Sequence, residues 1–150
     1  MSKYLTEKEN LNKAIDIAIS VIQEYPPKGF SKENIDHLIN TYLDFRNSVL
    51  NPLPNFDNSK SLSFIKNDVF TYFQEGSGVT VNQFWKKIES NNLPFKRENK
   101  LKKILSRNKI KNENEYQFII DVFQPYVESG LLNQLEIDSL NEMIRRYEEK

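Results

Sequence analysis

The residues with the clearest chemical potential in this 150-residue chain are basic side chains crowded into one stretch. Residues 86–111 contain ten lysines and arginines but only two acidic residues, Glu89 and Glu98. The chain as a whole is neutral, with 21 basic and 21 acidic residues. A local excess of positive charge in a neutral chain indicates a surface for an anionic partner, or a surface that an acidic part of the chain neutralises.

The segment that follows is strongly acidic, which makes internal neutralisation one of the alternatives. Residues 112–150 contain three basic and nine acidic residues. If the two segments pack together, we expect exposed ion pairs between them, each contributing about 0–1 kcal/mol to stability. The expected partners are Arg97 and Lys102 on one side and Glu113, Glu115 and Asp121 on the other. Otherwise the basic stretch faces an acidic protein or a nucleic acid, or it is only a solvated, lysine-rich face of the domain.

The spacing within the basic stretch predicts a cationic stripe along a helix over residues 95–107. At about 100° per residue, four of its cations fall within roughly 60° of one another. Together with a preceding helix over residues 80–89, it resembles a helix-turn-helix, in which the second helix enters the major groove of DNA. The stripe consists of Lys96, Lys100, Lys103 and Arg107. The complete set of candidate binding residues adds Arg97, Lys109 and Lys111.

Sequence-specific reading of DNA by this stripe is not indicated. Within residues 95–111, Asn99 and Asn108 are the only asparagine or glutamine side chains that could contact bases. The break at residues 91–95 is also longer than the usual turn of a helix-turn-helix. We therefore favour a protein partner and keep nucleic-acid binding as the alternative.

No other residues in the sequence point to catalysis, a metal or a cofactor. The chain has no cysteine, and its one histidine, His37, has no visible catalytic partner. Metal sites need several histidine, cysteine or carboxylate ligands at workable spacing, which we do not find. The segment 76–78 lacks the Lys-Ser/Thr of a phosphate loop and is interpreted as a hinge. We expect a non-enzymatic protein that needs no cofactor.

The apolar residues recur at helical spacing along the whole chain. This pattern predicts an all-α fold of six to seven amphipathic helices without a sheet. We expect a single domain over residues 1–150, with a possible subdivision into residues 1–75 and 79–150. The expected helices cover residues 7–24, 31–49, 61–76, 80–89, 95–107, 112–130 and 134–148.

Local signals predict where these helices begin and bend. Three residue pairs have the spacing of a capping box, in which two side chains satisfy free backbone N–H groups at a helix start. They are Thr6 with Glu9, Thr80 with Gln83, and Asn112 with Glu115. Pro125 is expected to kink or end its helix, and Leu135 is expected on the apolar face of the last helix.

Five aromatic residues flank the predicted hinge, and we interpret them as core. A groove lined by the same side chains is the alternative. The residues are Phe70, Tyr72, Phe73, Phe84 and Trp85.

The first ten residues are too polar for a signal peptide. No window of the sequence approaches the roughly 18 consecutive apolar residues of a membrane span. We therefore expect a cytoplasmic protein.

Several short segments in the second half of the chain carry a family resemblance. They are Phe84-Trp85-Lys86-Lys87-Ile88, Leu93-Pro94-Phe95-Lys96-Arg97-Glu98-Asn99-Lys100-Leu101, Ile104-Leu105, Glu115-Tyr116, Gly130-Leu131 and Leu140-Asn141-Glu142-Met143-Ile144. Through them, residues 81–149 resemble a group of small uncharacterised bacterial proteins associated with polymorphic-toxin neighbourhoods. In such neighbourhoods, small helical immunity proteins bind and block a toxin domain. The resemblance implies a protein partner such as a toxin, and no site residues. We expect an inhibitor or adaptor that covers a surface of its partner.

Overall fold

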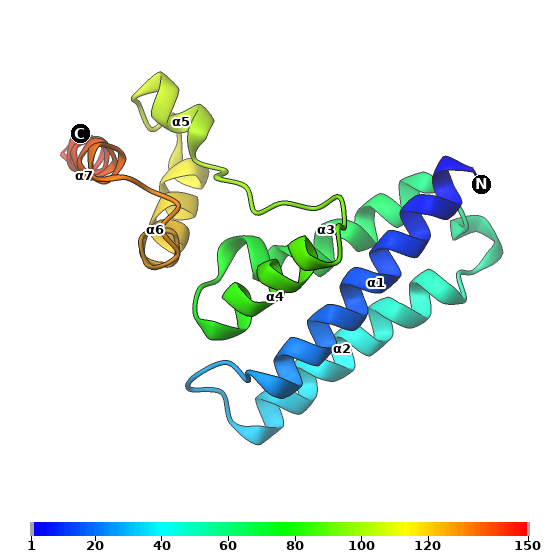
Figure 1. The fold of residues 1–150 in the computed structure, drawn as a ribbon. Helices are drawn as coiled ribbons and strands as arrows, with labels where there is room; N and C mark the ends of the chain where they lie inside the picture. Colours follow the sequence, from blue (N-terminus) through cyan, green and yellow to red (C-terminus); the bar gives the residue numbers. More distant parts are fainter. Residues whose placement is uncertain (1, 150) are drawn as a thin grey trace. The chain divides into compact units, whose positions relative to one another are not determined.

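A computed structural model describes residues 2–149, whose regular structure is entirely helical (Figure 1). More than half of these residues are in helices and none is in a strand, so the predicted all-α fold is confirmed. The α-helices are α1 (Lys3–Glu24), α2 (Lys32–Leu50), α3 (Ser59–Glu75), α4 (Val79–Ser90), α5 (Lys102–Arg107), α6 (Glu113–Glu128) and α7 (Gln134–Glu148), and a short 3-10 helix, η1, covers Pro54–Phe56.

The helices belong to two compact units. The first unit comprises residues 1–74 and 78–97, and the second comprises residues 75–77 and 98–150. Helix α4, which the sequence pattern groups with the second half of the chain, belongs to the first unit. The single-domain organisation over residues 1–150 stays a prediction.

In the first unit, α1 packs against α2 and α4. One face of α1 is fully buried, with apolar side chains at the three- and four-residue spacing that keeps them on one side of a helix. Two of them, Ala14 and Ala18, are small, which lets neighbouring helices approach closely. The helical spacing of apolar residues that the sequence shows is therefore the spacing of the buried face of α1.

Aromatic side chains hold α3 against α4 and α2. The rings of Phe73 and Phe84 stack with their centroids 3.8 Å apart, and Trp85 donates its indole N–H to the Phe73 carbonyl at 2.8 Å. From α2, Tyr42 donates its hydroxyl to the Val69 carbonyl at 2.7 Å, and this bond is buried. Phe70 is buried in the same cluster. The interpretation of these aromatics as core is confirmed.

The second unit has its own core, to which α5, α6 and α7 contribute. Ile104, Ile119 and Leu140 are among its buried side chains. Pro125 lies inside α6 but does not end it, because the helix runs on to Glu128. A proline so near the end of a helix removes only one backbone hydrogen bond, and the Pro125 carbonyl still accepts the Ser129 N–H at 3.0 Å.

Two of the predicted capping boxes are wrong, because Thr6 does not cap α1 and Thr80 does not cap α4. Helix α1 begins earlier than expected: Ser2 caps it, accepting the Leu5 N–H at 3.2 Å, and the Thr6 hydroxyl bonds the Ser2 carbonyl. The Thr80 hydroxyl donates to the Tyr25 carbonyl, so it ties α4 to the end of α1 instead of capping α4.

The predicted cap of α6 is present, because Asn112 accepts the Glu115 N–H at 2.9 Å. The other half of the expected box differs. The Glu115 carboxylate accepts the Lys111 N–H at 2.8 Å, one residue before the cap. This shift gives Glu115 a second role, described below.

The predicted helix over residues 95–107 is reduced to the six residues of α5, and residues 95–99 before it have no regular secondary structure. In this segment, buried or half-buried side chains alternate with exposed ones from Leu93 to Leu101. A two-residue period places alternate side chains on one side of an extended chain, whereas a helix would turn them to opposite faces. Phe95 contacts Phe70, with ring centroids 4.7 Å apart, and the side-chain amide oxygen of Asn99 accepts the Leu101 N–H at 2.9 Å.

The Tyr42 hydroxyl bond gives a direct test of how α2 is joined to α3. Substitution Tyr42→Phe removes one buried hydrogen bond and keeps the ring, so we expect the free energy of unfolding to fall by about 1 kcal/mol. The matched control is Tyr72→Phe, because the half-buried Tyr72 hydroxyl has no hydrogen-bond partner among residues 2–149. Urea denaturation followed by circular dichroism measures both. Equal stability changes in the two variants would show that the Tyr42 bond does not join the helices.

Candidate protein-binding surface

The structure divides the predicted binding residues between the two units. Lys96 and Arg97 lie in the first unit, whereas Lys100, Lys103, Arg107, Lys109 and Lys111 lie in the second. The expected continuous stripe is therefore not formed, because only Lys103 and Arg107 lie on α5. The helix-turn-helix arrangement is also absent from the described residues, since α4 and α5 belong to different units.

What remains is a short stretch of dense positive charge in the second unit, here called the cationic segment, residues 100–111. It contains six basic residues and no acidic one. All six side chains are exposed. Its basic residues are Lys100, Lys102, Lys103, Arg107, Lys109 and Lys111.

Two of these lysines occupy positions that the helix itself disfavours. Lys102 and Lys103 are the first two residues of α5, and the first turn of α5 contains no acidic residue. The amino-terminal end of a helix carries a partial positive charge, so cations there are unfavourable and carboxylates are favourable. Helix stability therefore does not explain why lysines stand at these positions.

Within residues 2–149, only Arg107 of the cationic segment lies within 4.0 Å of a carboxylate. Its guanidinium contacts both oxygens of Glu115, at 2.7 and 2.8 Å. Because Glu115 also accepts the Lys111 N–H, this carboxylate holds the end of α5 against the start of α6. Internal neutralisation thus occurs at one position, and through Arg107 in place of the expected Lys102.

Carboxylates of the acidic segment are engaged elsewhere in the second unit. Glu113 accepts the Tyr147 hydroxyl at 2.9 Å, and the Tyr116 hydroxyl donates to Glu148, so each of α6 and α7 offers a tyrosine to a glutamate of the other. The two tyrosine rings stack with centroids 4.9 Å apart. Hydrogen bonds from Gln117 and Tyr147 lower the pKa of Glu113, which keeps it ionised. These carboxylates are therefore committed to joining α6 and α7.

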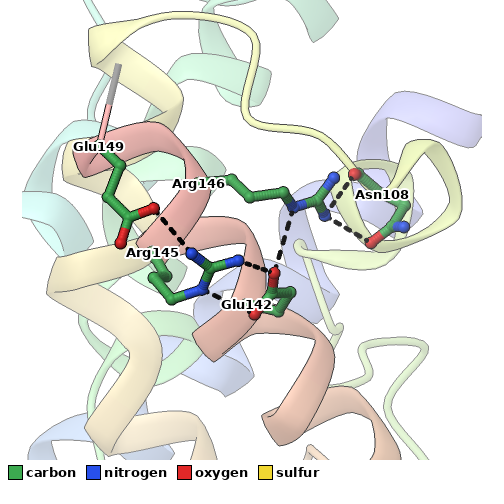
Figure 2. A network of polar contacts seen from close by, with 5 residues as sticks. All are labelled: Asn108, Glu142, Arg145, Arg146 and Glu149. Atoms are coloured by element: carbon green, nitrogen blue, oxygen red, sulfur yellow. Dashed lines mark hydrogen bonds and ion pairs between the residues drawn. The ribbon is translucent and has the colours of Figure 1, made fainter.

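A second arginine, which the sequence pattern did not single out, fixes the loop after α5. Arg146 of α7 donates to the Asn108 backbone carbonyl at 3.1 Å and to its side-chain oxygen at 3.3 Å (Figure 2). Asn108 ends α5 in the left-handed conformation, with φ of 57°. Asparagine is favoured at such helix ends, and this was the one sequence signal available for the contact.

Figure 2 also shows how Glu142 lies between the two adjacent arginines of α7. Arg145 pairs with Glu142 of the same helix and, at 2.7 Å, with Glu149, the residue that directly follows α7. Hydrogen bonding from Arg145 lowers the pKa of Glu142. Arg146 lies 4.0 Å from the same carboxylate and reaches beyond it to Asn108. Arg145 thus stabilises one helix, whereas Arg146 connects two.

Two shallow hollows border Arg146. One, of about 460 Å³, is lined by Asn108 and by α7 residues that include Leu135, and the other, of about 190 Å³, includes Lys109. Leu135 is 78% exposed, so its predicted place on the apolar face is wrong. It is the second residue of α7, ahead of the turns that reach the core. An exposed leucine thus lies on the same surface as the loop of the cationic segment.

The other residues considered from the sequence add no second site. His37 is exposed on α2, where its carbonyl accepts the Thr41 hydroxyl at 2.9 Å. Within residues 2–149, no three histidine, aspartate or glutamate side chains are grouped closely enough to hold a metal ion. In the same range, no helix combines the length and apolar character needed to cross a membrane.

In comparisons with known proteins, no family model, curated protein or solved structure matches this chain.

The role of Arg146 can be tested against its neighbour. In Arg146→Ala we expect faster hydrogen exchange at the Asn108 N–H, which bonds Ile104 at the end of α5, by about fivefold. Arg145→Ala is the matched control, since its exposed pairs within one helix contribute about 0–1 kcal/mol and none of them touches α5. The exchange rate of the Asn108 N–H is measured by NMR in both variants. Equal exchange at Asn108 in the two variants would contradict the connecting role of Arg146.

Proposed function

We propose that the chain is a non-enzymatic, cytoplasmic protein-binding module whose cationic segment docks on an acidic surface of another protein. The partner is a protein such as a toxin, and binding inhibits it by covering that surface, as in immunity-type proteins. The observation that carries the proposal is the placement of Lys102 and Lys103, exposed, without a carboxylate nearby, and at a helix start that disfavours them.

Local charge placement that opposes the fold is expected at functional sites, where sequence serves binding before stability. A partner carboxylate near Lys102 and Lys103 would relieve both their mutual repulsion and the unfavourable interaction with the helix end. Complementary charge of this kind speeds association and selects the partner more than it raises affinity. Leu135 adds the apolar contact that such interfaces place near charged groups.

The positive charge still favours the nucleic-acid alternative, but the arrangement of the cations does not. Six residues of helix extend only about 9 Å, so α5 offers little length to a major groove. The cations also lie on an extended segment, a short helix and a loop instead of one continuous face. The nucleic-acid alternative is therefore tested as binding to DNA phosphates that does not depend on the base sequence.

The test compares two charge-reversed variants that change the net charge equally. The first is Lys102→Glu with Lys103→Glu, and the matched control is Lys28→Glu with Lys32→Glu, two exposed lysines of the first unit. Tagged protein is incubated with a host-cell lysate in 150 mM salt, and retained proteins are identified by mass spectrometry. We expect one acidic protein to bind the wild type and the control, and its affinity for the first variant to fall at least about tenfold.

The melting temperature of each variant is measured to check that the variant is folded. We expect it not to fall in the first variant, because glutamate is favoured at both positions. The DNA arm uses fluorescence anisotropy with a 20-base-pair duplex. Equal capture by both variants would contradict the proposal. Micromolar duplex binding in 150 mM salt that only the first variant loses would establish the nucleic-acid alternative instead.

A further inference from the structure

A groove in the first unit, remote in sequence from the cationic segment, has the chemistry of a peptide-binding site. It lies between the end of α2, the α2–α3 connection with η1, and the start of α3, and its volume is about 720 Å³. Pockets that bind ligands commonly have volumes of about 300–1,000 Å³.

Helices α2 and α3 are bridged by the large side chain of Tyr42, but nearer the α2–α3 connection the side chains between them are short. The groove lies where these short side chains face each other. Tyr42 spans the helices where its hydroxyl reaches the Val69 carbonyl. Toward the connection, the residues lining the gap include Asn47, Ser48 and Ser61, whose side chains are too short to fill it. The gap therefore results from the residue types on both walls.

The apolar part of the groove consists of large side chains that the fold leaves in water. Phe64 is 62% exposed, Phe56 is 56% exposed and Leu53 is 66% exposed. By contrast, Phe73 and Phe84 of the same unit are fully buried. Grouped exposed apolar side chains of this size mark sites of binding.

The polar part of the groove is built from asparagine amides. The Asn51 side-chain N–H₂ donates to the Asn47 side-chain oxygen at 3.0 Å, which leaves the Asn47 N–H₂ and the Asn51 oxygen open to a ligand. The Asn55 side chain makes no hydrogen bond within residues 2–149. Each amide group offers both donors and an acceptor, the two functions needed to pair with a peptide backbone.

The charge in the groove has one sign. Among the described residues that line it, Lys60 alone is charged, and its exposed side chain has no carboxylate within 4.0 Å. The nearby Asp57 is engaged instead by the Tyr4 hydroxyl and, at 3.6 Å, by Lys8. The groove therefore complements a carboxylate.

We propose that this groove binds an extended peptide segment of another protein. Apolar side chains of the peptide lie against Phe56 and Phe64, its backbone pairs with the asparagine amides, and an acidic side chain or the terminal carboxylate meets Lys60. A helical ligand fits less well, because a helix satisfies its own backbone groups and leaves the amides unused. The proposal does not depend on the cationic segment, which lies in the other unit.

The probe for this test is a phage-displayed library of random 12-residue peptides, selected on the full-length chain. We expect enriched peptides that combine apolar residues with at least one carboxylate. Synthetic copies of these peptides should bind Phe64→Ser at least about tenfold more weakly, and Lys60→Glu about fivefold more weakly, than the wild type. The matched controls are Phe30→Ser and Lys28→Glu, which change the same residue types outside the groove and should bind normally.

Because Phe64 and Lys60 are exposed, both substitutions should leave the fold intact, which circular dichroism checks. The proposal is overturned if no peptide is enriched, if Phe64→Ser binds the enriched peptides as the wild type does, or if the peptides bind as helices. Analytical ultracentrifugation of the free chain tests whether it self-associates. Self-association that Phe64→Ser abolishes would make a second copy of the chain the occupant, and would also overturn the proposal.

Discussion

The spacing of apolar residues between Leu93 and Leu101 decides how this chain presents its charge. Leu93 and Phe95 pack on the core of the first unit, and Leu101 is fully buried in the core of the second. Residues two positions apart on a helix are separated by about 200° of rotation, so the predicted helix would turn the half-buried Phe95 and Arg97 to opposite sides. Only an extended backbone turns alternate side chains to the same side.

This constraint has consequences for the whole basic stretch. Lys96 lies on the non-helical segment and Lys100 in the turn before α5, so that of the predicted stripe only Lys103 and Arg107 remain on α5. Arg107 pairs with Glu115, and this contact joins α5 to α6. Other carboxylates accept hydrogen bonds from tyrosines and join α6 to α7. Among residues 2–149, no carboxylate lies within 4.0 Å of the exposed lysines of residues 100–111.

The sequence predicts most of the helices, because their apolar faces have a regular period. The last helix, residues 134–148, has the expected bounds, and Asn112 caps α6 as the sequence predicts. The errors occur where two signals compete locally. Thr80 has the spacing of a cap but bonds Tyr25, and Leu135 has the period of a core residue but stands before the turns that reach the core. Neither outcome depends on nearby residues alone.

The candidate surfaces were predictable only in part. The density of lysines in residues 100–111 is visible in the sequence, but their separation from Lys96 depends on packing in two different cores. Arg146 could not be foreseen, because its partner Asn108 lies 38 residues away. The groove beside Phe64 depends on which side chains fail to fill a gap between α2 and α3, and this follows from three-dimensional packing alone.

The central claim is that the cationic segment stays positive in the intact chain, and its electrostatic potential can be measured residue by residue. NMR relaxation of backbone amide protons is recorded with an anionic and with a cationic nitroxide in solution. We expect the anionic probe to relax the amides of residues 100–103 and 109–111 more strongly than the cationic probe, with a smaller difference at Arg107. Equal relaxation by the two probes along residues 100–111 would show that the chain neutralises this charge itself, and would contradict the claim.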